Sequence, residues 1–109
     1  MCLVTNFKNV LLYEAEKVKE SADYQYPKIS TILTLLANTE GKVVITGIGK
    51  SGHIAKKISA SFSSTGTPSV FMHATEGLHG DLGLIQEKDT VILISNSGET
   101  NELVSLIPT

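Results

Sequence analysis

Arginine is absent from this chain, and all nine basic residues are lysines. A bidentate guanidinium clamp for a phosphate or carboxylate group is therefore excluded. Any anion site must use backbone N–H groups, hydroxyl groups and lysine instead. The net charge of −2 also argues against a nucleic-acid-binding surface.

Cysteine and long apolar segments are also scarce. The single cysteine, Cys2, excludes an intramolecular disulfide and a cysteine-rich metal site. No apolar run approaches the roughly 20 residues of a membrane span, and the first residues do not resemble a signal peptide. With 109 residues, 41% of them hydrophobic, the chain is expected to be one soluble, cytoplasmic domain with no membrane partner.

Two helices are predicted before the first strand, in a lead-in covering residues 1–40. The first has apolar residues at helical spacing and ends near "SADYQYP", because Pro27 disfavours helical geometry at Tyr26. The second covers about Ile29 to Asn38 and is expected to stop at Gly41. The apolar positions of the first helix are Leu3, Phe7, Val10, Leu11 and Val18.

Residues 42–109 alternate between strand and helix patterns. Three buried strands are predicted at residues 42–49, 69–74 and 90–95, with a helix at 51–64 and another starting near Glu99. This order predicts an α/β fold with a doubly wound, flavodoxin-like parallel sheet, whose ligands bind at the carboxyl ends of the strands. Such domains usually have more than three strands, so the chain is expected to be cut short, with one uncovered edge.

"GIGKSG", from Gly47 to Gly52, stands where a strand turns into a helix and satisfies G-x-G-x-x-G. Its glycines permit a tight turn and an anion at the helix start, although a plain turn would explain them too. A dinucleotide site would place an acid at the end of the second strand, where Met72 and His73 stand. A P-loop would require glycine in place of Val44. A dinucleotide site and a P-loop are therefore both disfavoured.

"SNSGET" forms a second polar turn directly after the third strand. Ser95, Ser97 and Thr100 supply three hydroxyl groups around the start of a helix, where the helix dipole favours an anion. Capping alone would explain one serine, not three. The pattern favours a phosphate site.

"HATEGLHGDLG" places two histidines and two acids in the loop after the second strand. A metal site is disfavoured because His73 and His79 are six positions apart, with no third ligand at a clear spacing. A surface or structural role is the simpler interpretation for each histidine, and also for His53. Lys50 lies inside the first polar turn, where it is an anion contact, an acid–base group or a solvated side chain.

Three segments in this order and spacing resemble one family. "GIGKSGHIAKKISASFSSTGTPS", "HATEGLHGDLG" and "ISNSGETNE" look like the sugar isomerase (SIS) domain of arabinose-5-phosphate isomerases. The resemblance covers Lys42 to Glu102. It implies interconversion of D-ribulose 5-phosphate and D-arabinose 5-phosphate through an enediol, which supplies the sugar Kdo for lipopolysaccharide biosynthesis, with no cofactor and no metal.

The resemblance also implies roles for individual residues. Phosphate binding is implied for Ser51, Ser95, Ser97 and Thr100, and catalysis for Lys50, His79 and Glu102. Proton shuttling would belong to His79 or Glu102 and oxyanion support to Lys50, but the residues do not fix which one is the base. The resemblance also places four residues in the substrate loops, as a weaker expectation: Gly49, Glu76, Asp81 and Asn96.

Family members are commonly tetramers whose sites draw on neighbouring subunits, so a homo-oligomer is expected. The resemblance further implies a glutamate and a histidine beyond Thr109, and in many members a pair of CBS modules. The main alternative is a non-catalytic SIS module that senses a sugar phosphate, or an inactive fragment. A dinucleotide-binding domain and an isomerase of heptose or amino-sugar phosphates stay open as further alternatives.

Overall fold

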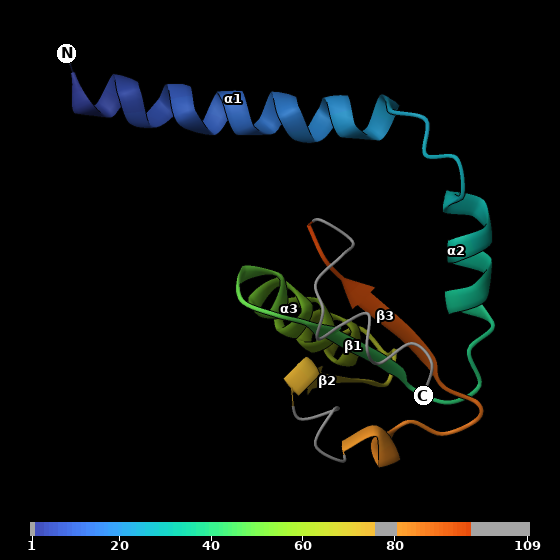
Figure 1. The fold of residues 1–109 in the computed structure, drawn as a ribbon. Coiled ribbons are helices and arrows are strands. Elements are labelled where there is room, and N and C mark those ends of the chain that lie inside the picture. The colour runs from blue at the N-terminus through green and yellow to red at the C-terminus, as the bar shows by residue number, and fades with distance from the viewer. Residues whose placement is uncertain (1, 76–80, 97–109) are drawn as a thin grey trace. The chain divides into compact units, whose positions relative to one another are not determined.

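The computed structural model describes residues 2–75 and 81–96 (Figure 1). The chain divides into two compact units, Met1–Ser30 and Thr31–Thr109. Each unit is described by itself. Among the described residues, no helix is both long and apolar enough to cross a membrane.

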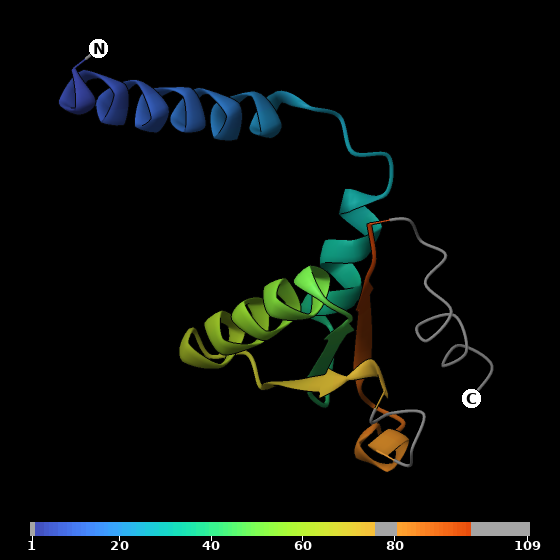
Figure 2. The same ribbon diagram turned by 60° about the vertical axis from the view of Figure 1, so that its left-hand side comes forward.

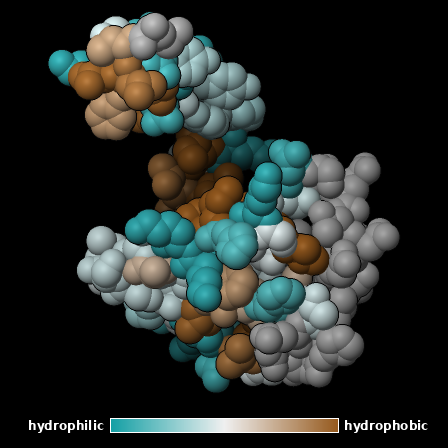
Figure 3. All heavy atoms as spheres, turned by 90° about the vertical axis from the view of Figure 1, so that its left-hand side faces the viewer, coloured by the Kyte–Doolittle hydropathy of each residue, from teal (hydrophilic) through white to brown (hydrophobic). Residues whose placement is uncertain are grey.

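The N-terminal unit consists mainly of α1 (Leu3–Asp23), and α2 (Ile29–Ala37) begins at its end. As predicted, α1 ends before Pro27, and Tyr24 is already extended. No residue of α1 is buried, and apolar side chains lie at its surface (Figure 3). The exposed apolar residues of α1 are Leu3, Val4, Phe7, Val10, Leu11, Leu12, Tyr13 and Val18.

The second unit contains a three-stranded parallel sheet with the order β2-β1-β3 (Figures 1 and 2). The strands are β1 (Val43–Gly47), β2 (Ser69–His73) and β3 (Thr90–Ile94). Between them lie α3 (Lys50–Ser64) and the short 3-10 helix η1 (Asp81–Leu84). The predicted α/β fold with a parallel sheet is confirmed, although each strand ends one or two residues earlier than expected.

Alternate residues of β1 supply the two halves of the core, because successive side chains of a strand point to opposite faces. On the face covered by α3, Val43 and Ile45 pack with Ala55. On the other face, Val44 packs with Met72 and Ala74. Partly buried residues extend the two clusters: Leu36, Ile58, Phe62, Phe71, Ile92 and Ile94 on the first face, and Ile48, Val70 and Ile85 on the second.

The expectation of three buried strands is correct only for β1, in which all five residues are buried. In β2 only Met72 is buried, and β3 has no buried residue. Val91 and Leu93 are each 38% exposed. The physical reason is position: in the described sheet β1 has a neighbour on both sides, whereas β2 and β3 each pair with β1 alone.

Gly41 does not end the second helix, contrary to expectation. The helix already ends at Ala37, and Gly41 does not have the positive φ of a glycine C-cap. Instead, a Cβ at Gly41 would collide with the carboxylate of Asp89 and lie 2.9 Å from the carbonyl oxygen of Lys88. Gly41 is therefore needed for the close approach of the loop before β3.

Asp89 joins the amino ends of β1 and β3. Its carboxylate lies 2.6 Å from Lys42 Nζ and accepts backbone N–H bonds from Lys42 (2.9 Å) and Gln86 (2.8 Å). The hydroxyl groups of Thr39 and Thr90 lie 2.6 Å apart beside it. The Lys42 side-chain hydrogen bond is the largest cause that lowers the pKa of Asp89, from 3.8 to about 2, followed by the two backbone bonds.

Candidate functional site

The carboxyl ends of all three strands lie at one edge of the sheet. In the register, Gly47 at the end of β1 is paired with His73 of β2 and with Ile94 of β3. The turn that follows β1 and the turn that begins at Ser95 therefore start side by side. The two polar turns predicted to bind phosphate share this edge.

The three glycines of the first turn have two different functions. A Cβ at Gly47 would lie 2.8 Å from the carbonyl oxygen of Ser51, and a Cβ at Gly52 would lie 3.0 Å from that of Gly47. These two glycines let α3 start directly against the end of β1. Gly49 instead has a φ of +62°, which side-chain-bearing residues rarely adopt, and open space where a Cβ would stand.

The start of α3 is open to an anion. Gly49 is its N-cap and provides no side-chain cap hydrogen bond. The first N–H groups of a helix have no intrahelical acceptors, and together with the helix dipole they favour a negatively charged ligand. Lys50 is exposed and Ser51 is half-buried in this first turn. The first turn of α3 thus contains backbone, hydroxyl and lysine donors, the types expected to bind an anion in a chain without arginine.

Basic residues gather in the amino-terminal half of α3. Lys50, His53, Lys56 and Lys57 all lie within its first eight residues, the last seven carry no charge, and the helix has no acid. Cations are favoured at the carboxyl end of a helix and disfavoured at its amino end. Of these four residues, only Lys50 and His53 lie in the first turn of α3, where the helix dipole acts.

The second polar turn is described only at its start. Ser95 is half-buried directly after β3, and Asn96 is exposed. Asp81 begins η1, and its side chain is not described. Five further predicted site residues lie outside the described residues: Glu76, His79, Ser97, Thr100 and Glu102. Their roles, and those of Lys50, Ser51 and Ser95, stay predictions.

A pocket of about 260 Å³ lies between α3 and β2 at the same edge. Three basic side chains line it: His53 and Lys56 from α3, and His73 from β2. The ring of Phe71 and the backbone of Gly47, Gly49 and Gly52 complete the described lining. The sequence predicts a surface or structural role for both histidines and does not reveal that they lie in one pocket. The spacing of His53 and Lys56 was the available signal, because residues three apart share one side of a helix.

His73 has a defined orientation in this pocket. Its Nδ1 accepts a hydrogen bond from the backbone N–H of Thr75 at 3.2 Å. A neutral imidazole has one donor and one acceptor nitrogen, so this bond leaves Nε2 as the donor. Phe71 makes an edge-to-face contact with the ring, with the centroids 6.4 Å apart. Within residues 2–75 and 81–96, no three His, Cys, Asp or Glu side chains gather as a metal ion would require.

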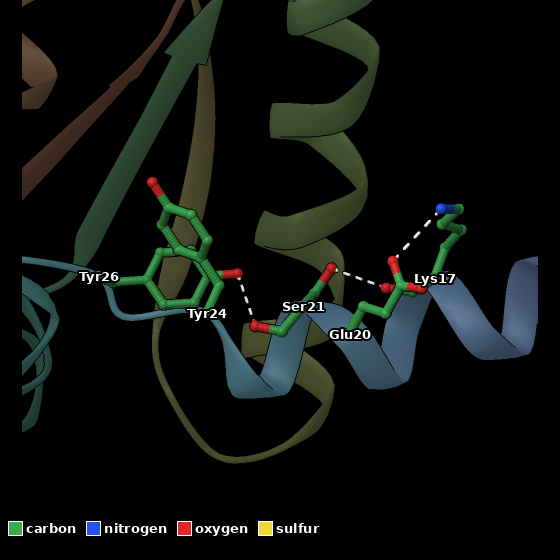
Figure 4. Close-up of a pocket in the computed structure, with 5 residues that line it drawn as sticks. All are labelled: Lys17, Glu20, Ser21, Tyr24 and Tyr26. Carbon is green, nitrogen blue, oxygen red and sulfur yellow. Dashed lines mark hydrogen bonds and ion pairs between the residues drawn. The ribbon is translucent and has the colours of Figure 1, made fainter.

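A second hollow, of about 450 Å³, lies at the end of α1 and is lined by Lys17, Glu20, Ser21, Tyr24 and Tyr26 (Figure 4). Its interactions are local. The hydroxyl of Tyr26 donates to the carbonyl of Ser21 at 2.8 Å, and Lys17 lies 3.3 Å from Glu20. These contacts explain how α1 ends and do not indicate a ligand.

Comparison with known proteins gives consistent matches. Residues 35–109 match the model of the SIS domain family. The chain is 43% identical over 107 residues to arabinose 5-phosphate isomerase KpsF of Escherichia coli, covering 97% of this chain and 34% of that protein. It is 48% identical over 101 residues to arabinose 5-phosphate isomerase KdsD of Shigella flexneri, covering 93% of this chain and 31% of that protein.

Among solved structures, the E. coli CFT073 protein c3406 in complex with arabinose 5-phosphate is similar, with a TM-score of 0.84 and 46% identity. The match covers 97% of this chain and 56% of that one. The present chain spans about a third of the length of the two curated relatives.

Proposed function

This chain belongs to the SIS domain family, and we propose that it forms part of an aldose–ketose isomerase that interconverts D-arabinose 5-phosphate and D-ribulose 5-phosphate. The observation that carries the proposal is the pairing of Gly47 with Ile94. Because of this pairing, both polar turns begin at the same edge of the sheet, beside the start of α3, whose N-cap Gly49 provides no side-chain hydrogen bond. The two curated relatives are arabinose 5-phosphate isomerases, and c3406 was solved in complex with arabinose 5-phosphate. These similarities support D-arabinose 5-phosphate as the substrate.

In the proposed mechanism, the phosphate group is held and the other end of the sugar reacts. Ser51 and the start of α3 bind the phosphate from one turn, and Ser95, Ser97 and Thr100 bind it from the other. Fixing a group remote from the reacting carbons limits the motion of the sugar and supplies positioning. Hydroxyl and N–H donors suit a phosphate dianion in a chain that has no arginine.

The reaction itself moves one proton between neighbouring carbons. A base removes the proton from C2 of the aldose, the electron pair forms the C1–C2 double bond of an enediolate, and the carbonyl oxygen on C1 gains a proton. Reprotonation at C1 and loss of the proton from the C2 hydroxyl give the ketose. We assign proton transfer to His79 or Glu102 and stabilisation of the oxyanion to Lys50. The redox state of the sugar as a whole is unchanged.

Three finer points belong to the same proposal. The enzyme is cytoplasmic, it supplies Kdo for lipopolysaccharide biosynthesis, and it works as a homo-oligomer. The last point rests on the resemblance to a family whose members are commonly tetramers.

A kinetic comparison of two lysine variants of the full gene product tests the proposal. Formation of ribulose 5-phosphate from arabinose 5-phosphate would be measured for Lys50→Ala and Lys57→Ala. We expect kcat to fall about 100-fold in Lys50→Ala, because an electrophilic contact is lost, and to stay near wild type in Lys57→Ala. Equal kcat values in the two variants would contradict the role of Lys50, and no turnover by the wild type would contradict the isomerase.

A further inference from the structure

Thr46 carries a hydroxyl group that is buried without a hydrogen-bond partner among the described residues. It is fully buried at the last position but one of β1. An unpaired buried hydroxyl lowers the stability of the free protein, and valine would fill the same space without this cost. Such groups are rare in folded proteins, and a partner in the ligand-bound state is one reason to retain one.

The side chains around Thr46 within the sheet are apolar. Side chains of a strand alternate between its two faces, so Thr46 lies on the same face of β1 as Val44, opposite α3. Its register partners are Met72 of β2 and Leu93 of β3. None of these three side chains has more than a weak hydrogen-bonding group. The partner of Thr46 therefore does not come from the strand side chains that surround it.

The sheet edge with the two polar turns begins one residue beyond Thr46. Gly47 ends β1 and opens the first turn. The half-buried Ser95 opens the second turn, and it follows Leu93 by two positions, in phase with the face of Thr46. The usual spacings of about 4.8 Å between strands and about 3.3 Å per residue place the Cα atoms of Thr46 and Ser95 about 8 Å apart. Two hydroxyl groups at this separation can share one bridging water.

We propose that Thr46 is a positioning residue of the sugar-phosphate site, whose hydroxyl gains its hydrogen-bond partner when the turn that begins at Ser95 binds the ligand. Thr46 acts through Ser95 and does not touch the sugar itself. The bond exists only in the bound protein, so it adds to the affinity, whereas the free protein bears the cost of the unpaired group. The inference rests on the proposed function in one respect, namely that the polar turns bind a sugar phosphate.

Two substitutions separate the hydroxyl of Thr46 from its shape. Thr46→Val keeps the shape and removes the hydroxyl, so we expect an unchanged or higher melting temperature of the free protein and a Kd about tenfold higher. Thr46→Ser keeps the hydroxyl and removes a buried methyl group, so it should lower the melting temperature and keep the Kd of the wild type. A merely structural residue would change stability and affinity in the same direction.

The ligand in this experiment is D-arabinitol 5-phosphate, titrated calorimetrically into the full gene product. It has the phosphate group of the proposed substrate and no carbonyl group, so it is not isomerised during the measurement. Thr90→Val is the matched control, because Thr90 begins β3 at the other end of the sheet. Loss of its 2.6 Å bond to Thr39 should lower the melting temperature and leave the Kd unchanged.

Double variants test the connection to Ser95. Thr46→Val should raise the Kd less in a Ser95→Ala background than in a Ser51→Ala background, because substitutions are non-additive only where the residues share an interaction. Equal effects in the two backgrounds would contradict the action through Ser95 and overturn the proposal.

The single variants can overturn it as well. The proposal fails if Thr46→Val binds as tightly as the wild type, if it destabilises the free protein, or if Thr46→Ser binds as weakly as Thr46→Val. A wild type that does not bind the sugar phosphate would overturn it together with the proposed function. No arm of the experiment measures turnover, so an inactive wild type that binds would contradict the isomerase alone.

Discussion

A Cβ atom at Gly47 would lie 2.8 Å from the carbonyl oxygen of Ser51, so the first turn of α3 packs directly against the end of β1. Real Cβ atoms essentially never come this close to a backbone oxygen. The same contact positions Ser51, a predicted phosphate ligand, next to the sheet edge. Packing between strand and helix therefore determines where the site can form.

Replacing Gly47 with alanine should destabilise the fold and displace the start of α3. Because the colliding atoms belong to the backbone and not to a flexible side chain, we expect a loss of about 1–3 kcal/mol in the free energy of unfolding. Urea denaturation followed by circular dichroism measures it. Gly83→Ala is the matched control, since a Cβ there meets no atom of the described residues within 4 Å. Equal stability of the two variants would show that the close approach is not as described.

Ser51→Ala should weaken the binding of arabinose 5-phosphate without a comparable loss of stability. Removal of one hydroxyl donor to a charged group is expected to raise Kd about tenfold. Isothermal titration calorimetry checks the affinity, with Ser64→Ala as the control on the same helix, because the Ser64 hydroxyl bonds only to nearby carbonyl groups. An unchanged Kd in Ser51→Ala would remove this residue from the phosphate site.

The interaction between Asp89 and Lys42 should make stability depend on pH in acid. The folded-state pKa of Asp89 is about 2, below its ordinary 3.8, so the stabilisation is fully present above pH 3.8 and is lost as pH falls towards 2. Asp89→Asn cannot titrate and should flatten this part of the curve. The measurement is the free energy of unfolding in urea between pH 2 and pH 6.

Glu87→Gln is the control for this experiment, because Glu87 is an exposed carboxylate in the same loop. It should retain the acid-dependent loss seen in wild type. If Asp89→Asn and wild type lose stability in parallel, other carboxylates cause the dependence.

Thr46→Val should be neutral or stabilising, by about 1 kcal/mol. Thr46 is fully buried on β1, and its hydroxyl oxygen has no hydrogen-bond partner in the described part of the chain. A buried hydroxyl without a partner is costly, and valine has nearly the same shape. Thr90→Val should do the opposite, because it breaks the 2.6 Å bond to Thr39. Thermal unfolding of both variants tests the pair, and clear destabilisation by Thr46→Val would mean that its hydroxyl is satisfied.

Much of the fold could be predicted because its signals are local. The continuous apolar run of β1 indicated a buried strand, Pro27 indicated the end of α1, and alternating elements indicated a parallel sheet. The start of the predicted site could also be located, since G-x-G-x-x-G lies where β1 turns into α3. The order of the described strands then brings Ser95 to the same edge.

Other features depend on contacts between residues far apart in the sequence. Asp89 meets Lys42 47 positions earlier, and Gly41 is required by that approach and not by the end of a helix. The exposure of Leu93 follows from the position of β3 in the sheet, which its composition does not reveal. The pocket between α3 and β2 could not be predicted either, because it depends on the register that pairs Gly47 with His73.

The most direct test of the isomerase is to incubate the full gene product with D-arabinose 5-phosphate in D₂O and to analyse the products by NMR. We expect D-ribulose 5-phosphate to form and to carry deuterium at C1, because a base that passes the proton from C2 exchanges part of it with solvent. If the sugar phosphate binds but no ribulose 5-phosphate appears, the protein is not an isomerase, and the chain is part of a binding module.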